Sequence, residues 1–196
     1  MIDNLLIRYA NKNDDIKKMA QLIYETDPYI YPALLGEKES GIDILSSIIK
    51  RNDAVFCYEN ILVAVMENEI VGVLVCLNKY YTWHMNFDFD LKPPYWDYTS
   101  ENYMSKLHEY MSDDTLYISN ISVDQKSHNK GIGSALIDYV LSHNKSKQLA
   151  LHVLTDNKNA IHLYERKGFK IIQEDQGFSV NEDEVVKCYY MRTDID

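Results

Sequence analysis

The 196-residue chain lacks several features that would place it in particular classes of protein. It has only three cysteines, Cys57, Cys76 and Cys188, and their wide spacing argues against a disulfide framework and against a zinc site. No apolar run approaches the roughly twenty residues that span a bilayer, and the N-terminus has no basic segment followed by a hydrophobic one. We therefore expect a cytoplasmic protein with no metal ion and no membrane partner.

Basic residues are also scarce. The chain has 20 lysines and arginines against 30 aspartates and glutamates, which gives a formal net charge of −10. A negative surface repels the phosphate backbone, so we expect no nucleic-acid partner. The simpler interpretation of the acidity is that it aids solubility, and the alternative is long-range attraction of a cationic substrate.

What remains is the composition of a globular protein. Hydrophobic residues make up 46% of the chain, and 196 residues are enough to bury the core of one ordinary domain. The sequence contains no internal repeat, linker or low-complexity tract. We therefore predict a single domain over residues 1–196.

The most informative stretch runs from Tyr117 to Leu136 and reads YISNISVDQKSHNKGIGSAL. Residues 118–123 form an apolar, β-branched run typical of a strand, and a polar turn leads from it to Gly131 and Gly133. A helix is predicted to follow, with apolar residues recurring every three or four positions. Its predicted buried face comprises Ile132, Ala135, Leu136, Tyr139, Val140 and His143.

A strand, a glycine-containing loop and a helix in direct succession predict an anion-binding site. The first backbone N–H groups of a helix have no partner within the helix and lie at the positive end of its dipole, so they attract phosphate. Glycine has no Cβ and lets phosphate oxygens approach the main chain. The alternative for a lone G-x-G is that the two glycines only shape a turn.

A second motif, N-x-x-A-x-x-L-Y-x-x-x-G-F, lies farther along the chain. It consists of Asn157, Ala160, Leu163, Tyr164, Gly168 and Phe169. Together with V-D-Q-K-S-H-N-K-G-I-G at residues 123–133, it closely resembles the GNAT superfamily of acetyl-CoA-dependent N-acetyltransferases, and the resemblance is clear over residues 62–169. Where the family usually has Arg or Gln followed by Gly, this chain has His128 and Asn129. Asn tolerates a left-handed backbone, but a fixed side-chain cation is lost.

The resemblance implies an α/β (α+β) GNAT fold, with about four helices around a twisted, mixed, mostly antiparallel sheet of about six to seven strands. Hydrophobic patterning predicts strands at residues 5–9, 61–66, 70–77, 116–123, 148–154, 169–173 and 185–192. Helices are predicted around residues 16–23, 42–51, 132–143 and 158–167. Asn13 or Asp14 would cap the first helix, residues 24–36 read as a loop, and Gly72 marks a bulge or a close backbone contact.

Residues 79–114 interrupt the pattern between the third and fourth strands. This segment is longer than an ordinary connection and is rich in aromatic side chains, among them Trp83 and Trp96. A helix is predicted to begin in it at Ser100. We expect the insert to form a lid or wall over the acceptor site, and a homodimer contact is the alternative.

The resemblance also implies which residues bind acetyl-CoA. Main-chain groups at residues 121–123 would pair with the pantetheine arm, and an N–H within residues 120–123 would polarise the acetyl carbonyl. The predicted cofactor-binding residues are Ile121, Ser122, Val123, His128, Asn129, Lys130, Gly131, Ile132, Gly133, Ser134, Asn157 and Ala160. Ser134 and Asn157 also suit helix capping, and the two roles are compatible.

Catalytic and acceptor residues follow from the same resemblance. Tyr164 occupies the position of the family's usual general acid, which protonates the departing thiolate, although helical spacing alone would make it a core residue. Strand alternation places Tyr117, Ser119 and Ile121 on one face. The predicted acceptor-binding residues are Tyr29, Tyr31, Trp83, Tyr117 and Ser119.

The sequence singles out no general base. The candidates are ordered water and four side chains of the insert, His84, Asp88, Asp90 and His108. His152 and His162 are interpreted as structural.

We therefore predict an acetyl-CoA-dependent N-acetyltransferase that acts on a primary amine of a small molecule or a peptide N-terminus by direct transfer. The alternative is a GNAT-fold module that binds a CoA derivative without transferring anything. The loop is not G-x-x-x-x-G-K-[ST], which argues against phosphate transfer, and a nicotinamide site would need a third glycine.

Overall fold

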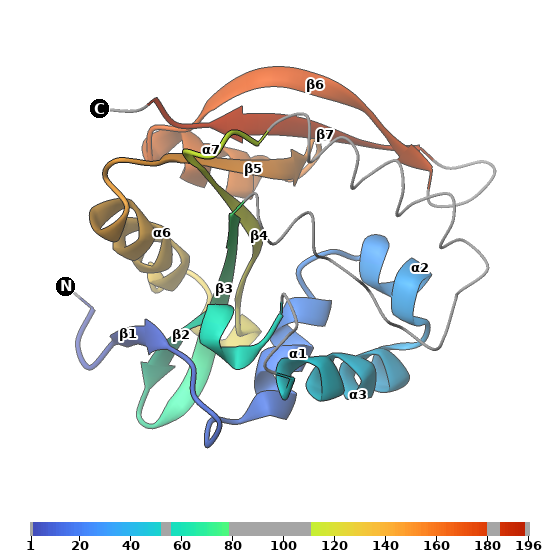
Figure 1. Cartoon of the computed structure of the whole chain (residues 1–196), viewed down its shortest axis with the longest axis vertical. Helices are drawn as coiled ribbons and strands as arrows, with labels where there is room; N and C mark the ends of the chain where they lie inside the picture. Colours follow the sequence, from blue (N-terminus) through green and yellow to red (C-terminus); the bar gives the residue numbers. More distant parts are fainter. Residues whose placement is uncertain (1, 52–55, 79–110, 180–184, 195–196) are drawn as a thin grey trace.

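The computed structural model describes residues 2–51, 56–78, 111–179 and 185–194. A seven-stranded sheet in the order β1-β2-β3-β4-β5-β7-β6 carries helices on both faces (Figure 1). All neighbouring strands are antiparallel except β4 and β5. The strands are β1 (Leu6–Tyr9), β2 (Ile61–Met66), β3 (Glu69–Asn78), β4 (Thr115–Val123), β5 (Gln148–Leu154), β6 (Lys170–Ser179) and β7 (Val185–Arg192). The helices are α1 (Ile16–Tyr24), α2 (Ile30–Leu35), α3 (Lys38–Ile49), α6 (Ile132–His143) and α7 (Lys158–Arg166), with 3-10 turns η1 (Tyr58–Asn60) and η2 (Gln125–Ser127).

The predicted fold class is confirmed, because the sheet is mixed, mostly antiparallel and flanked by helices. Strand β6 runs six residues beyond its predicted end at Gln173, since two register shifts let it stay paired with β7 across a polar stretch. The insert falls between β3 and β4, as predicted. Residues 79–110, with Trp83 and the helix predicted from Ser100, lie outside the described residues.

Helix α1 begins after both of its predicted caps. Asp15 is the N-cap, and its side chain accepts a hydrogen bond from the backbone N–H of Lys18 at 2.9 Å. Asp14 instead accepts two hydrogen bonds of 2.7 Å from the guanidinium of Arg8 on β1. The prediction of Asn13 or Asp14 as the cap is wrong, because Asp14 is hydrogen-bonded to Arg8 on β1 and Asp15 is the cap.

Residues 24–36, predicted as a loop, contain helix α2. Pro32 lies in the first turn of α2, where a backbone N–H would have no helical partner, so proline does not interrupt the helix. The Asp27 carboxylate accepts the N–H groups of Tyr29 and Ile30, both at 2.7 Å, and so satisfies donors at the start of this helix. Gly36, with a φ of 75°, ends the helix in a positive-φ conformation.

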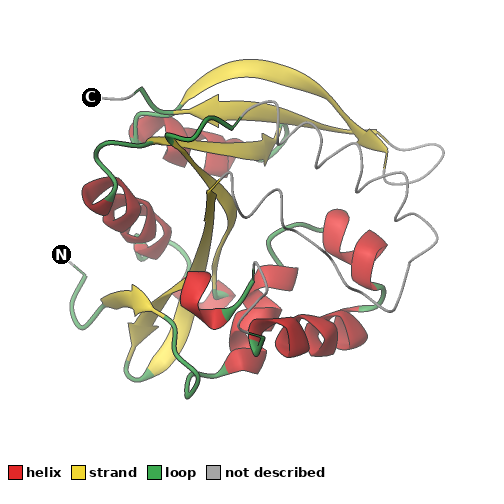
Figure 2. Cartoon of the chain, viewed as in Figure 1, coloured by secondary structure: helices red, strands yellow, loops and turns green. Residues whose placement is uncertain are grey.

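Two hydrophobic cores lie on opposite faces of the sheet. One joins α1, α2 and α3 to residues such as Val73 and Val75, and the other joins α6 and α7 to residues such as Leu74 and Ile118. Figure 2 shows the two groups of helices on either side of β3 and β4.

The buried face of α6 differs at two positions from its prediction. Ile137 is fully buried although the predicted face left it out. His143, predicted as buried, is exposed in the last turn, where its ring stacks on Tyr139 with the centroids 4.0 Å apart. The core therefore wraps farther around the middle of the helix than around its end.

Gly72 shows both of the features predicted for it. The β2–β3 register shifts between Ala64 and Val65, directly opposite this glycine, which marks a bulge. A Cβ at Gly72 would lie 3.2 Å from the carbonyl oxygen of Ser122, so β4 approaches too closely for a larger residue without adjustment.

A second bulge decides which side chains of β4 share a face. Asn120 lies opposite Val75 and Ile118 lies opposite Cys76, so Ser119 is an extra residue in β4. Beyond it the alternation is inverted: Tyr117 lies opposite Leu77 of the α1–α3 core, and Ile121 lies opposite Leu74 of the α6–α7 core. The prediction that Tyr117 and Ile121 share one face is wrong, because a one-residue bulge reverses the pattern that follows it.

Candidate active site

Strands β4 and β5 are paired at one end and separate at the other. Their parallel pairing runs from Thr115 with Gln148 to Ile118 with Leu151, after which β5 continues beside β7. The edge of β4 that faces β5, from Ser119 to Val123, has no described strand beside it (Figure 1). An extended ligand can add its own hydrogen-bonding groups to such an edge, as a further strand would.

The loop after β4 presents backbone N–H groups. Asn129, with a φ of 60°, and Gly131, with a φ of 80°, are both left-handed, and Gly131 is the N-cap of α6. The first hydrogen bond at this end runs from the N–H of Ala135 to the Gly131 carbonyl at 3.0 Å, so the N–H groups of residues 132–134 precede it. Ser134, which suits a capping role by residue type, lies inside the first turn and is not the cap.

Side chains hold this loop in place. Asp124 forms an ion pair with Lys18 of α1 and accepts the backbone N–H of Lys126 at 2.9 Å, and the contact with Lys18 lowers the pKa of Asp124. The ring of His128 donates from Nε2 to the carbonyl oxygen of Val123 at 2.8 Å. His128 therefore braces the loop at the position where the family usually has Arg or Gln.

The two sequence motifs meet at the first turn of α6. A Cβ on Gly133 would lie 3.7 Å from the side chain of Leu163 and 3.8 Å from that of Val123, so β4, α6 and α7 converge there. Asn157 caps α7 by accepting the N–H of Ala160 at 3.2 Å through its side-chain oxygen. The exposed amide N–H groups of Asn157 remain available to a ligand.

Tyr164 lies in the core between α6, α7 and the sheet. It is 6% exposed, and its ring packs against Phe169 with the centroids 5.7 Å apart. Its hydroxyl makes no hydrogen bond with the described residues, which is unusual for a buried polar group. Burial raises the pKa of Tyr164, so the phenol stays protonated near neutral pH.

A tyrosine and a histidine lie where β4 and β5 begin to separate. Tyr117 is 1% exposed, and its hydroxyl is 2.9 Å from Nδ1 of His152. The other ring nitrogen, Nε2, is 2.8 Å from a carboxylate oxygen of Asp175 on β6. Sequence reasoning treated His152 as structural. Alternation in β5 places it on the face of Ala150, the partner of Tyr117, and that signal would have found the pair.

Asn120 connects β4 to the segment after α1. Its amide nitrogen donates to the hydroxyls of Thr26 at 2.8 Å and Tyr31 at 2.7 Å, and its oxygen accepts from the hydroxyl of Ser119 at 2.9 Å. Asn120 therefore brings together Tyr31 and Ser119, two residues predicted to contact the acceptor. Tyr29, also predicted to contact the acceptor, is half-buried. The contacts of the Asn120 side chain could not be predicted from sequence, because they depend on the bulge at Ser119. Trp83, also predicted to contact the acceptor, lies outside the described residues.

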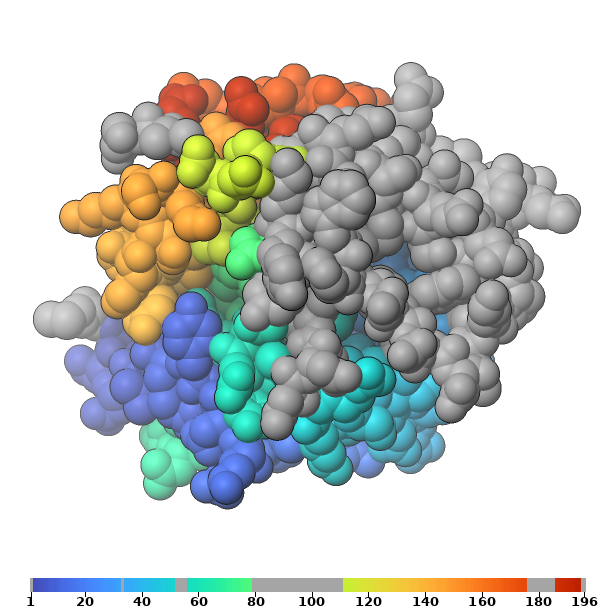
Figure 3. Space-filling model, viewed as in Figure 1, coloured from blue at the N-terminus to red at the C-terminus, as the bar shows by residue number. Residues whose placement is uncertain are grey.

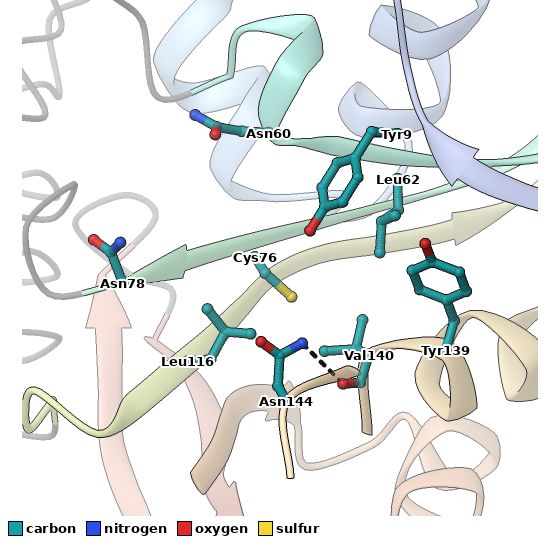
Figure 4. Close-up of a pocket in the computed structure, with 9 residues that line it drawn as sticks. All are labelled: Tyr9, Asn60, Leu62, Cys76, Asn78, Leu116, Tyr139, Val140 and Asn144. Carbon is teal, nitrogen blue, oxygen red and sulfur yellow. Dashed lines mark hydrogen bonds between the residues drawn. The ribbon is translucent and has the colours of Figure 1, made fainter. Parts of the chain in front are cut away.

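The opposite end of β4 borders a cavity of about 160 Å³ (Figure 4). It is lined by Tyr9, Asn60, Leu62, Cys76, Asn78, Leu116, Tyr139, Val140 and Asn144. These residues come from the first four strands, from η1, and from the C-terminal part and C-cap of α6, which lies beside β1 on the face shown in Figure 3. The Cys76 thiol points into the cavity, and burial raises its pKa. No predicted site residue lines this cavity, so it is separate from the glycine loop.

Within the part of the chain that the structure describes, no three His, Cys, Asp or Glu side chains are grouped as metal ligands would be. Each helix there is too short or too polar to cross a membrane.

The chain matches the model of the acetyltransferase (GNAT) family over residues 18–169. The chain therefore belongs to the acetyltransferase (GNAT) family, and the family predicted from the two motifs is confirmed. A segment of 60 residues is 40% identical to N-alpha-acetyltransferase 60 of Danio rerio and covers 28% of this chain. That match spans only a quarter of the length of the curated relative, 25%.

Solved structures of low sequence identity share the fold. An N-acetyltransferase from Staphylococcus aureus Mu50 is similar with a TM-score of 0.72 and 21% identity, over 96% of this chain and 100% of that one. A GNAT family acetyltransferase from Elizabethkingia anophelis with acetyl-CoA bound is similar with a TM-score of 0.58 and 19% identity, over 98% of this chain and 99% of that one. NAA60 of Arabidopsis thaliana in complex with a bisubstrate analogue has a TM-score of 0.62 and 18% identity, over 98% of this chain and 99% of that one.

Proposed function

We propose that the protein is an acetyl-CoA-dependent N-acetyltransferase that transfers the acetyl group directly to a primary amine, with a peptide N-terminus as the preferred acceptor. The observation that carries the proposal is the separation of β4 and β5 beside the glycine loop, which leaves a main-chain edge and a helix N-terminus next to each other. This arrangement suits a ligand with an amide-containing arm and a pyrophosphate.

The residues present fit acetyl-CoA. The N–H groups at the start of α6 precede its first hydrogen bond and would hold the pyrophosphate, with Gly131 giving close access to the main chain. The edge at Ile121 and Val123 would pair with the pantetheine amides, and the amide of Asn157 would add a donor. When bound, acetyl-CoA supplies an activated acetyl thioester. Family membership and the acetyl-CoA bound in the similar Elizabethkingia structure support this cofactor.

The residues around the opening of the strands supply the proton steps. The acceptor nitrogen must lose a proton as it attacks the acetyl carbon. The Tyr117 oxygen takes that proton while its own hydroxyl proton passes to Nδ1 of His152, 2.9 Å away. A backbone N–H within residues 120–123 would hydrogen-bond to the acetyl oxygen as negative charge develops on it.

Tyr164 is proposed to protonate the departing sulfur. Burial keeps its phenol neutral, and its hydroxyl makes no competing hydrogen bond with the described residues. A neutral donor without another partner can give its proton as the carbon–sulfur bond breaks.

The choice of acceptor rests on the similar proteins. The Danio rerio relative is named as an N-alpha-acetyltransferase, and NAA60 of Arabidopsis thaliana was solved with a bisubstrate analogue. Small primary amines are the other acceptor class predicted from the sequence. A cytoplasmic location and a homodimer stay predictions, which cell fractionation and light scattering would check.

Release of free thiol from acetyl-CoA tests the proposal. The acceptors are a panel of short peptides with free N-termini, the same peptides with a blocked N-terminus and an internal lysine, and small alkylamines. We expect release with the free N-termini and little with the blocked peptides. Turnover only with small amines would overturn the acceptor, and calorimetric binding of CoA without turnover on any acceptor would favour a binding module.

A further inference from the structure

Asp175 is a buried carboxylate that the transfer reaction described above does not use. It is 8% exposed and lies on β6 directly before a register shift between Asp175 and Phe178. Its two oxygens have different partners: Oδ2 is 2.8 Å from Nε2 of His152, and Oδ1 accepts the side-chain N–H of Gln173 at 2.8 Å. Bulges commonly redirect side chains next to active sites. The register shift after Asp175 is such an irregularity, and the two hydrogen bonds of Asp175 fix the position of its carboxylate.

The carboxylate determines where the histidine carries its proton. An ionised carboxylate only accepts hydrogen bonds, so Nε2 of His152 must carry the hydrogen in this contact. Nδ1 is then the bare nitrogen, and the hydroxyl of Tyr117 must donate to it. The three side chains thus form a chain of hydrogen bonds with one direction, from Tyr117 through His152 to Asp175.

The opposite tautomer would close this route. If Nδ1 carried the hydrogen, it would donate to the Tyr117 oxygen and could not accept the hydroxyl proton. The contact with Tyr117 fits either tautomer, because a hydroxyl can both donate and accept, whereas the contact with the Asp175 carboxylate fits only the Nε2–H form.

We propose that Asp175 is a positioning residue that holds His152 in the Nε2–H tautomer, so that Tyr117 and His152 can receive the proton of the acceptor amine. This inference rests on the proposed N-acetyltransferase function. As the nitrogen lone pair forms the C–N bond, the amine proton goes to the Tyr117 oxygen and the hydroxyl proton of Tyr117 goes to Nδ1 of His152. The histidine becomes a cation, and its charge is balanced by the Asp175 carboxylate. Tyr117 ends the step neutral. The extra proton then returns from Nδ1 of His152 to the Tyr117 oxygen, as the hydroxyl proton of Tyr117 leaves to solvent.

The surroundings of His152 make Asp175 the group to test. Among the described residues, the titratable groups that face His152 are Tyr117 on β4, Asp175 on β6, and Cys188 and Tyr190 on β7. The Tyr190 ring lies 5.2 Å from the His152 ring, and Arg192 lies beside Tyr190. Asp175 is the carboxylate among them, so it is the group that can stabilise a cationic His152 directly.

The first experiment compares Asp175→Asn with Glu174→Gln, a matched loss of one carboxylate on the same strand. Glu174 is exposed and pairs at 3.3 Å with Lys187, away from His152. Asp175→Asn should lower kcat at least about tenfold, because proton transfer through a mispositioned base is impaired. The affinity for CoA should stay unchanged, so the loss should be confined to kcat. Glu174→Gln should behave as the wild type.

The second experiment needs no variant and no turnover. Nitrogen-15 NMR of histidine-labelled wild-type protein reports which ring nitrogen of His152 carries the hydrogen. We expect the Nε2–H form, and an Nδ1–H form would overturn the inference even if Asp175→Asn fails to fold.

The two experiments separate this inference from the proposed function. A wild-type enzyme that turns over, together with an Asp175→Asn variant of unchanged kcat, would overturn the positioning role and leave the transferase intact. A wild-type protein without turnover would overturn the function, and the tautomer measurement would still decide whether Asp175 orients His152.

Discussion

Tyr164 has two properties that suit a proton donor to sulfur. Burial raises its pKa, so the phenol is protonated at the pH where the enzyme would work. Its hydroxyl has no hydrogen-bond partner among the described residues, although buried polar groups normally have one. A departing thiolate would satisfy that hydroxyl at the step that needs a proton.

Replacing Tyr164 with Phe removes the hydroxyl and keeps the ring that packs on Phe169. We expect turnover to fall roughly ten- to a thousand-fold, because a general acid is lost, while acetyl-CoA affinity hardly changes. Steady-state kinetics and calorimetry on the same preparation check both. A lowered melting temperature with near-normal kcat would show that Tyr164 only packs.

A second residue-scale prediction concerns Asp14, whose pKa is lowered chiefly by its hydrogen bonds with Arg8. A lowered folded-state pKa means that the stabilisation is present above the unfolded-state pKa of about 3.9 and is lost as the pH falls through the folded-state value. Asp14→Asn should therefore cost about 1 kcal/mol near neutral pH, a figure limited by solvent screening, and the difference from wild type should disappear in strong acid.

Chemical denaturation near neutral pH and in strong acid measures this difference in the free energy of unfolding. Asp43→Asn is the matched control, because Asp43 is exposed and pairs with Lys17 only at 3.6 Å. The control should change the free energy of unfolding very little at either pH. An acid-independent loss in Asp14→Asn would mean that its backbone contact with Asn11, not the ion pair, supplies the stability.

At the scale of elements, the β4–glycine loop–α6 unit defines the site. The edge of β4 is exposed because its pairing with β5 ends at Ile118. Helix α6 begins after Gly131, which has a left-handed backbone conformation. The bulge at Ser119 turns Asn120 toward Thr26 and Tyr31, which ties this unit to the segment after α1. The walls of the proposed cofactor and acceptor sites therefore belong to one connected set of elements.

Gly131→Val tests the loop. The φ of Gly131 is 80°, a conformation that costs a β-branched residue about 1–2 kcal/mol or forces the backbone to change. We expect acetyl-CoA affinity to fall at least about tenfold in a folded protein, measured by calorimetry, because the pyrophosphate amides move. Gly168→Val is the control: its φ is 86° with nothing within 4 Å of a Cβ, so it bears similar strain away from the loop. Equal loss of affinity in both variants would mean that strain alone is responsible.

In the molecule as a whole, the sheet lies between the two larger hydrophobic clusters of the described residues. Helices α6 and α7 pack on one face with the glycine loop, and α1, α2 and α3 pack on the other with Asn120 and its partners. A ligand that lies along the open edge of β4 would touch elements from both halves. Binding should therefore stabilise the entire fold.

Thermal unfolding measures that stabilisation. A ligand that binds only the folded chain at one hundred times its dissociation constant adds about 2.7 kcal/mol. For a chain of this size that corresponds to a rise in melting temperature of about 5–11 °C. Acetyl-CoA should produce this rise in the wild type and a smaller one in Gly131→Val at the same concentration. An unchanged melting temperature with both proteins would contradict the cofactor site.

Elements with local sequence signals were predicted correctly. β5 and β7 begin and end at the predicted residues, and the bulge or contact at Gly72 and the cap at Asn157 were predicted from residue type alone. These features depend on apolar alternation and on conformational preferences that act within a few residues. The two motifs also gave the family, because their residues follow one another at fixed spacing.

Features that depend on contacts between different elements could be seen only in the folded chain. Asp14 pairs with Arg8 of β1 and leaves the cap of α1 to Asp15. The contacts of His152 with Tyr117 and Asp175 join three strands that are far apart in sequence. Which side chains meet across a sheet depends on register, and one extra residue in a strand inverts every face beyond it, so no local pattern can assign such partners.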